Sequence, residues 1–321
     1  MTRLIIRHET RYSYERPVTF GQHRLLVRPR DSHATRILQA SLAFSPSGKT
    51  RWVYDAMDNC VCLLNPHGEA RELTIVSKLA IERFPAPLSP LRIENPHTAM
   101  PIVYDKSDRA VLGPFLEPIT EDPDGDLLQW VRGVVGHADE PALDFLLRFN
   151  RHIHGQFAYS ARAEEGVQDP AFTVTSGVGT CRDFAWLMVE ALRRLGYAAR
   201  FVTGYLYSPA NAAVRGAGAT HAWCQVFLPE LGWMEFDPTN AIVGNRDLIR
   251  VAVTRDPAQA VPLAGTWNGA ALDFLDRQLA IRGAEDVGEA VLREVQRNLA
   301  AHEACEREKP GQRTFEDADV G

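Results

Sequence analysis

One cysteine, Cys181, stands where a nucleophile could be activated. It follows a glycine-rich approach and begins a stretch whose apolar residues recur at helical spacing. Thr180 is placed to cap this helix, and Asp183 lies three residues further on, the spacing of a capping box. Backbone N–H groups and the positive end of the helix dipole would stabilise a thiolate and a developing oxyanion. The alternative is a small apolar residue tucked under the helix, as free cysteines often are.

Two downstream segments could supply the base for such a nucleophile. Residues 220–226 contain His221 and residues 232–239 contain Asp237, and the two segments look like strands of one hairpin. If the turn places Trp223 opposite Asp237, then His221 and Asp237 are diagonal neighbours on one face. A slip of one residue would separate them onto opposite faces. With the first register, Asp237 could hold one imidazole nitrogen while the other faces Cys181.

Both residues also have ordinary structural interpretations. His221 could be a hydrogen-bonded strand histidine, and Asp237 could cap an Asp-Pro turn. Other candidate sites are weaker, because the pairs Cys60 with Cys62 and His152 with His154 are not part of a four-ligand metal pattern. No glycine loop of the dinucleotide or phosphate-binding type occurs, so we expect no nucleotide, no metal and no other cofactor.

The elements that would position these residues follow an α+β pattern. Apolar residues recur at near-helical spacing in residues 127–135 and 143–153, and again in 181–195, where Gly196 ends the helix. Strands are expected at about 198–206, 221–228 and 233–237. A helix packed against an antiparallel sheet is the layout that this order favours.

The regions outside this core differ in composition. Residues 1–84 contain short strand-like runs separated by turn residues, which predicts an antiparallel β domain. Prolines recur from residue 85 to 123, which indicates a linker at 85–124 before the core at 125–265. Residues 266–321 are expected to form a helical C-terminal extension with a disordered tail. An apolar stripe after Ala284 would permit an oligomer through that helix.

Bulk composition excludes several classes of protein. A content of 45% hydrophobic and 24% charged residues is ordinary for a water-soluble globular chain. The formal net charge of -6 gives no basic field for nucleic acid or anionic membranes, so neither is an expected partner. We see no signal-peptide core and no run of about 20 apolar residues that could span a bilayer. The default expectation is a cytoplasmic protein whose five cysteines are free thiols.

Four sequence blocks together resemble a known family. Residues 179–185, 199–205, 220–223 and 232–240 are similar in order and spacing to the transglutaminase-like core of bacterial proteins. Residues 12–30 resemble the β-rich region that commonly precedes this core. The resemblance covers roughly residues 1–265, and it implies a papain/transglutaminase-like cysteine-hydrolase fold with a Cys-His-Asp triad at Cys181, His221 and Asp237.

The chain departs from the family pattern at Arg182 and Trp186, where many relatives carry Gln and often His. Neither residue belongs to the triad. Arg182 could favour the thiolate further or select an acidic substrate, and it could equally point to solvent. Calcium dependence, known in animal transglutaminases, is not expected because no acidic ligand loop is present.

The resemblance implies acyl transfer at an amide or ester carbonyl of a peptide or protein substrate. With water as acceptor the chain would be a cysteine peptidase or amidase, which we favour because prokaryotic relatives resemble proteases at least as much as cross-linkers. With an amine as acceptor it would have protein-glutamine gamma-glutamyltransferase activity. The alternative from another class is a binding or scaffold protein that keeps the fold without turnover.

Overall fold

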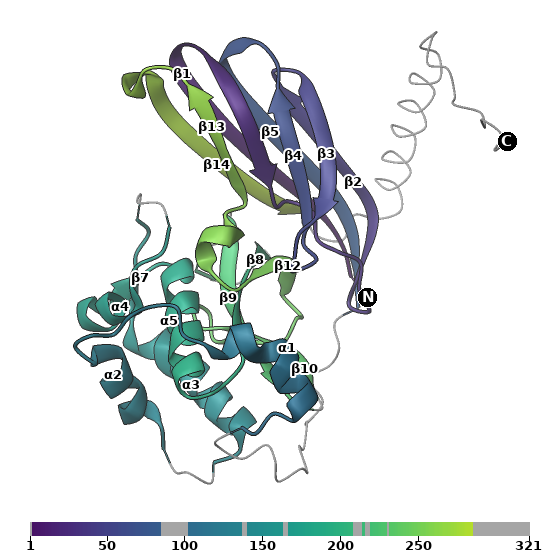
Figure 1. The fold of residues 1–321 in the computed structure, drawn as a ribbon. Helices are drawn as coiled ribbons and strands as arrows, with labels where there is room; N and C mark the ends of the chain where they lie inside the picture. The colour runs from purple at the N-terminus through teal and green to yellow at the C-terminus, as the bar shows by residue number, and fades with distance from the viewer. Residues whose placement is uncertain are drawn as a thin grey trace, which may run out of the picture.

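The computed structural model describes residues 2–84, 102–136, 140–162, 166–207, 214–215, 219–229 and 231–284. The chain builds most of one β-sheet, crosses into a mixed helical and sheet region, and finally returns to the first sheet (Figure 1). We call residues 2–84 with 263–284 the sheet domain and residues 102–260 the core domain. The α+β class expected from the sequence is confirmed.

The sheet domain is organised around one very long strand, β1. Its strands are β1 (Thr2–Leu25), β2 (Thr35–Ser45), β3 (Gly48–Tyr54), β4 (Cys60–Pro66) and β5 (Glu69–Arg83), in the order β2-β5-β1-β4-β3. The first half of β1 pairs antiparallel with β5, and the register shifts between Ser13 and Val18. From Leu4 to Thr10 every second residue of β1 is buried, as expected for a strand with one covered face.

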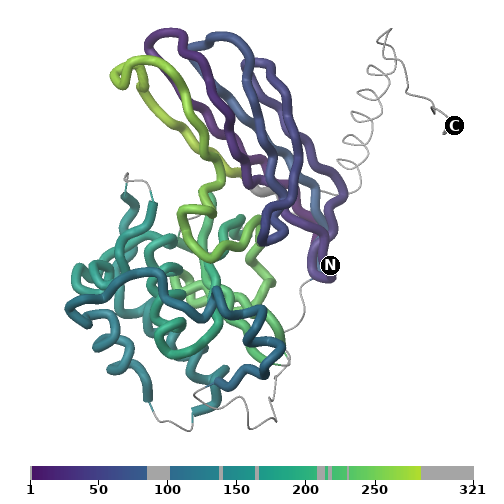
Figure 2. Tube along the Cα trace, viewed as in Figure 1, coloured from purple at the N-terminus to yellow at the C-terminus, as the bar shows by residue number. Residues whose placement is uncertain are grey.

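The C-terminal part of the described chain completes this sheet. β13 (Leu263–Asn268), the short 3-10 turn η3 (Ala271–Asp273) and β14 (Phe274–Ala284) follow the core domain. β13 pairs with the second half of β1 and β14 with its first half. The two ends of the described chain therefore run side by side, purple against yellow-green in Figure 2.

This pairing corrects the expectation of a helical extension for residues 266–284, and the expected boundary at 265 falls inside β13. The physical reason is that β1 offers an unpaired edge to residues 274–284, and pairing with it satisfies their backbone groups. Such a long-range partner overrides local propensity. The helix expected after Ala284 and the disordered tail lie outside the described residues.

The core domain places helices against one curved antiparallel sheet. Its helices are α1 (Lys106–Leu116), α2 (Asp126–Val134), α3 (Ala142–Gln156), α4 (Pro170–Ser176) and α5 (Cys181–Arg194). Its sheet has the order β11-β10-β9-β8-β12, with β8 (Ala199–Leu206), β9 (His221–Leu228), β10 (Gly232–Asp237), β11 (Ile242–Val243) and β12 (Leu248–Thr254). Short segments β6 (Ala158–Tyr159), β7 (Val178–Gly179) and η2 (Pro257–Ala260) complete the described elements. α5 packs directly on β8 and β9.

Part of the expected linker belongs to this core. α1 lies within residues 85–124, and the Tyr104 side chain before it is buried. The Tyr104 hydroxyl accepts from the Ala198 N–H at 2.8 Å and donates to the Phe227 carbonyl at 3.0 Å. α1 forms although it contains Pro114. Burial of Leu112 and Phe115 in the core outweighs the destabilising effect of the prolines. Residues 85–101 of the linker lie outside the described residues.

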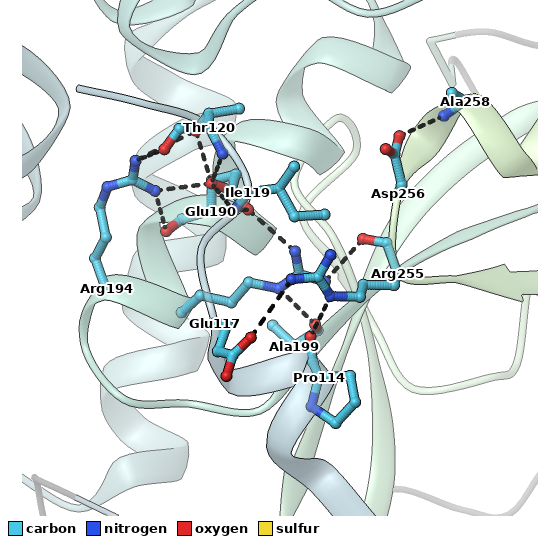
Figure 3. A network of polar contacts seen from close by, with 11 residues as sticks. Pro114, Glu117, Ile119, Thr120, Glu190, Arg194, Ala199, Arg255, Asp256 and Ala258 are labelled. Atoms are coloured by element: carbon cyan, nitrogen blue, oxygen red, sulfur yellow. Dashed lines mark hydrogen bonds and ion pairs between the residues drawn. The ribbon is translucent and has the colours of Figure 1, made fainter. Parts of the chain in front are cut away.

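The C-terminal half of α5 is fixed by a buried ionic network (Figure 3). The Glu190 carboxylate is fully buried and is paired with Arg193 at 3.1 Å and Arg194 at 2.9 Å. It also accepts hydrogen bonds from the backbone N–H groups of Ile119 and Thr120. Burial alone would raise the pKa of Glu190, but the Thr120 and Arg194 contacts lower it, so the carboxylate stays ionised.

The two domains share an interface that is both apolar and hydrogen-bonded. Leu4, Ile6, Leu79 and Ile81 of the sheet domain pack with Tyr205 and strand β12 of the core domain. The Asn59 side chain forms a two-way bond with the backbone of Val253, at 2.8 Å in each direction. This interface holds the first half of β1 over the start of α5 and β9. None of the described helices has the length and apolar character needed to cross a bilayer.

Candidate active site

Cys181 is the first residue of α5 and is 7% exposed. The backbone N–H of Thr180 donates to the Asp183 carboxylate at 2.8 Å, which confirms the backbone half of the predicted capping box. The Thr180 hydroxyl also donates to Asp183, at 2.8 Å. The first N–H groups of a helix have no intrahelical partner, and Cys181 lies in this first turn of α5.

Asp183 does more than cap α5. Its buried carboxylate is paired with the Arg162 guanidinium, with contacts of 2.8 and 3.1 Å, and it accepts from the Gln168 backbone N–H at 2.7 Å. Burial by itself raises the pKa of Asp183, but Arg162 and the N–H donors lower it below its ordinary value. The contacts tie Arg162 and Gln168 to the N-terminus of α5. Sequence reasoning missed Arg162 and Gln168, for which no local signal exists.

The predicted hairpin has the register that brings His221 and Asp237 together. Phe236 of β10 pairs with Cys224 of β9, so Asp237 comes next to Trp223, which is the first of the two registers that the sequence left open. The His221 Nε2 atom lies 2.8 Å from Asp237 Oδ2, and both side chains are fully buried. The diagonal contact predicted from strand alternation is therefore confirmed.

The Asp237 carboxylate is held from several sides. The Thr239 backbone N–H donates to Oδ1 at 2.9 Å, and the Asn240 amide donates to Oδ2 at 3.0 Å. Asn240 in turn accepts from the Arg215 backbone N–H at 2.8 Å. Burial tends to raise the pKa of Asp237, whereas His221 and these donors lower it below its ordinary value. Asn240 was missed as a site residue, although it lies only three positions after Asp237.

The surroundings of His221 favour its protonated form. Burial favours the neutral imidazole, but the charge of Asp237 and its hydrogen bond, together with Cys181, raise the pKa of His221 to about 10. Nδ1 makes no conventional hydrogen bond to any described residue, so it is the nitrogen left for the thiol. Trp223 stacks beside the ring at a centroid distance of 6.0 Å, and its indole N–H donates to Glu235 at 2.8 Å.

Cys181 and His221 line one cavity of about 280 Å³. The core domain provides one wall through α5 and β9, with Arg182 next to Cys181. The sheet domain provides the facing wall through β1 and β14, including His8 and Arg277. We call this cavity the Cys181 cleft. Because the cleft lies between the domains, residues that are remote in sequence surround the thiol. The sequence predicted only the wall that the core domain provides.

The other candidate residues fall outside the cleft. Cys60, Cys62 and Cys224 are buried thiols, and burial raises the pKa of Cys62 to about 11. His154 bonds to the Thr239 carbonyl at 2.7 Å, and His152 packs beside a tryptophan ring. In the part of the chain that the structure describes, no cluster of three His, Cys, Asp or Glu residues could hold a metal ion.

Comparison with known proteins identifies the same two units. Residues 128–238 match the transglutaminase-like superfamily, and residues 4–82 match the bacterial transglutaminase-like N-terminal region. An uncharacterized protein of Mycobacterium leprae is 26% identical over 279 residues, which cover 86% of this chain and 97% of that protein. A protein-glutamine gamma-glutamyltransferase of Pseudomonas aeruginosa is 36% identical over 120 residues, covering 34% of this chain but 17% of that protein.

The fold has a counterpart among solved structures. The crystal structure of a candidate cysteine protease from Cytophaga hutchinsonii matches with a TM-score of 0.66, covering 89% of this chain and 91% of that one. The two share 18% sequence identity, so the likeness concerns the fold. Two adjacent family matches, in the order expected from the sequence, agree with this fold. The chain therefore belongs to the transglutaminase-like superfamily.

Proposed function

We propose that this chain is a thiol enzyme that cleaves amide bonds by acyl transfer, with Cys181 as nucleophile, His221 as acid and base, and Asp237 as the residue that orients His221. The observation that carries the proposal is the single cleft that contains both Cys181 and His221. Behind His221, Asp237 holds the second ring nitrogen at 2.8 Å. The order in space from the thiol to the imidazole to the carboxylate supports acyl-transfer chemistry, in which a nucleophile is activated by a base that a third group orients.

Each step can be assigned to a group in the cleft. The Cys181 sulfur attacks the carbonyl carbon as a thiolate, its proton resting on His221 Nδ1. The carbonyl oxygen gains the electron pair and lies near backbone N–H groups at the start of α5. When the C–N bond breaks, the amine leaves with the proton from His221, and the acyl group stays on sulfur as a thioester. Water, deprotonated by His221, then releases a carboxylic acid and restores the thiol.

The acceptor decides between two activities with the same triad. We favour water, which makes the protein a cysteine peptidase or amidase acting on a peptide or protein. The specific support for the second activity, transfer to an amine, is the segment shared with the Pseudomonas aeruginosa protein-glutamine gamma-glutamyltransferase. A third possibility is a binding protein that keeps the fold without turnover.

Alkylation of Cys181 tests the activated thiol directly. Iodoacetamide labelling is followed by peptide mapping as a function of pH in the wild type and in His221→Ala. We expect rapid labelling of Cys181 well below pH 8.5, about where a free thiol ionises, and loss of that labelling in the variant. Buried Cys224 in the same chain is an internal control that should stay unlabelled. Slow labelling that is indifferent to His221 would favour the binding protein.

A partition experiment separates the two enzymatic activities. The protein is incubated with a mixture of peptides, with and without a primary amine, and the products are weighed by mass spectrometry. Hydrolysis adds one water to a cleaved peptide, whereas transfer attaches the amine and releases ammonia or a peptide amine. Cys181→Ala should abolish both products. If the amine and water reach the active site equally well, a larger yield of amine adduct than of hydrolysis product would overturn the preference for hydrolysis.

A further inference from the structure

The buried polar groups in the walls of the Cys181 cleft already have partners within the protein. On β1, His8 Nδ1 bonds to the Tyr205 hydroxyl at 3.0 Å and His8 Nε2 bonds to the Thr10 hydroxyl at 3.2 Å. Among the buried side-chain atoms of the described residues, His221 Nδ1 is the one atom of a cleft residue that has no hydrogen-bond partner. The proposed reaction uses that nitrogen. The other buried polar groups of the walls are therefore satisfied without a substrate.

The charged side chains at the cleft are also engaged by other groups of the protein. Arg162 is paired with the buried Asp183 carboxylate at 2.8 Å. Arg182 and Arg277 line the cleft too, and both interact with other groups of the chain. No aspartate or glutamate is among the described lining residues. Charge therefore gives no basis for the selection of a substrate here.

Apolar side chains occupy both walls of the cleft and the segment that joins them. Ala222 directly follows His221 on β9 and pairs with Thr203 of β8, so apolar surface begins beside the base. Both Ala222 and Thr203 line the cleft. We call the six larger or more central apolar lining residues the apolar patch, and they are Phe201, Ala222, Ala260, Val261, Leu263 and Leu279.

The apolar patch is held by both domains. Residues 260–263 carry the chain from the core domain to the sheet domain, and the Leu26 N–H donates to the Pro262 carbonyl at 2.7 Å. Leu263 then pairs with Leu25 of β1. The floor of the patch belongs to the main hydrophobic core, whereas Val261 and Leu279 at its rim are each 37% exposed. An apolar side chain that entered the cleft would remove this rim from water.

We propose that the Cys181 cleft takes acyl donors with an uncharged, apolar side chain next to the reacting carbonyl, and that the apolar patch binds this side chain. This inference rests on the proposed function and adds the substrate class. Burial of apolar surface is favourable in proportion to its area, whereas a polar side chain would lose water without gaining a partner. The cavity of about 280 Å³ lies just below the roughly 300–1,000 Å³ of small-molecule pockets, so it suits a short extended segment with a side chain of about the size of leucine.

Chloromethyl ketones of amino acids measure this preference at the thiol itself. In each of them the Cys181 sulfur forms a bond to the same methylene carbon and chloride leaves, so only the side chain varies. The probes are the uncharged N-acetyl derivatives of alanine, norvaline, leucine and asparagine, the last two of nearly equal shape. Division by the rate for the unfolded chain removes differences in intrinsic reactivity. We expect the corrected rate to rise about threefold for each buried methylene, and leucine to exceed asparagine by about tenfold or more.

Three surface variants locate the preference. Leu279→Ser should lower the ratio of the leucine rate to the alanine rate several-fold. Leu275→Ser is its matched control, because Leu275 lies on the same strand β14, is 59% exposed and does not line the cleft, and this variant should leave the ratio unchanged. Ala258 is exposed and lines the cleft, so Ala258→Phe should fill the space and make the alanine reagent the faster one. Thermal unfolding checks that all three variants fold.

The outcomes separate this inference from the proposed function. Equal corrected rates for the alanine, norvaline and leucine reagents, or a faster asparagine reagent, would overturn the preference for an apolar side chain. Equal losses in Leu279→Ser and Leu275→Ser would overturn the assignment to the apolar patch. In each of these cases rapid labelling of Cys181 by iodoacetamide would leave the proposed function intact. Failure of iodoacetamide and of every chloromethyl ketone to label Cys181 would remove the proposed function and this inference with it.

Discussion

The two walls of the Cys181 cleft are built in different ways. The core wall comes from residues 180–240, where a capped helix and a two-stranded hairpin place Cys181, His221 and Asp237 within one sequence-local unit. The sheet wall joins residues 5–14 of β1 to residues 274–284 of β14, from opposite ends of the described chain. The chemistry therefore has a local origin, whereas the surroundings of the thiol depend on long-range pairing.

The walls also differ in how firmly their polar groups are held. The carboxylates of Asp183 and Asp237 in the core wall are fully buried, and each accepts several hydrogen bonds. Arg277 in the sheet wall is exposed. A buried charge that loses its partner is costly, while an exposed charge can be removed cheaply. We therefore expect changes in the core wall to abolish reactivity or stability, and changes in the sheet wall to alter selectivity.

Asp237→Asn should have the largest effect on reactivity. Without the carboxylate, the pKa of His221 loses the largest of the contributions that raise it, and the ring loses the partner that fixes its orientation. We expect the rate of Cys181 alkylation near neutral pH, and any turnover, to fall by about a hundredfold or more. Stopped-flow or quench labelling with peptide mapping gives this rate.

Glu235→Gln is the control for Asp237→Asn. Glu235 is also buried on β10, but it bonds to Trp223 and Gln225 and does not contact His221. Burial raises the pKa of Glu235, the opposite direction to Asp237, so a neutral side chain is better tolerated there. Its replacement should change the alkylation rate by no more than a few-fold. A loss as large as that of Asp237→Asn would remove the distinction between the two carboxylates.

Asp183→Asn should cause the largest loss of stability among the core-wall changes. The variant leaves Arg162, whose side chain is 15% exposed, without its carboxylate partner. Breaking a buried pair from one side costs about 3–5 kcal/mol, and we expect the lower end because an amide retains some hydrogen bonds. Urea unfolding measures the loss. Asp169→Asn, at the exposed N-cap of α4, should cost only a few tenths of a kcal/mol, and a similar cost at both positions would contradict this account.

The His221–Asp237 pair should give stability a defined pH dependence. The pKa of His221 is raised from 6.5 to about 10, so its contribution is complete below pH 6.5 and is lost as the pH rises through about 10. The pKa of Asp237 is lowered from 3.8, so its contribution is present above that value and is lost as the pH falls through the folded-state pKa. The stability advantage of the wild type over Asp237→Asn should therefore be greatest between about pH 4 and 6.5.

Thermal unfolding of the wild type and Asp237→Asn at several pH values between about 4 and 10 checks this window. Taking the difference between the two proteins cancels groups that titrate equally in both, including buried His8. The difference should shrink steadily from pH 6.5 towards pH 10. A difference that grows over this interval would mean that the buried imidazole is neutral and that the direction of its pKa shift is the reverse.

Sequence reasoning succeeded where the signal was local. The helix after Thr180 follows from its cap and its apolar spacing, and the contact of His221 with Asp237 follows from strand alternation once the hairpin turn fixes the register. Strand, turn and strand together occupy fewer than twenty residues, so few alternative pairings compete. The core wall could thus be assembled from neighbouring parts.

The sheet wall could not be found in the same way. Residues 274–284 contain only a weak alternation around Leu279 and Ile281, and their partner strand lies at the other end of the chain. Without that partner, local propensity does not choose strand over helix. Arg162 and Asn240 were missed for a related reason, since a side chain that supports a buried carboxylate has no periodic pattern of its own. Arg277 is visible as a cleft residue only after β14 is placed.

Thr10→Val tests the connection between the walls and should have the smallest effect. The Tyr205 hydroxyl donates to the Val27 carbonyl at 3.1 Å, so it must accept from His8 Nδ1. His8 Nε2 then lacks a proton and accepts from the Thr10 hydroxyl. These bonds link β1, at the wall of the cleft, to β8 of the core domain. Valine preserves the shape of threonine but removes the donor, leaving the buried Nε2 acceptor unpaired.

The cost of this lost bond should be about 1 kcal/mol, because the removed contact is neutral and long. Thermal unfolding measures it, and Thr74→Val serves as the control since the Thr74 hydroxyl bonds to Glu72 at an exposed site of the same sheet. Iodoacetamide labelling of Cys181 should not change, because His8 contacts neither Cys181 nor His221 through a hydrogen bond. A drop in labelling with stability preserved would instead mean that the hydrogen bonds of the sheet wall also position the thiol or its base, and the division between a reactive wall and a selective wall would fail.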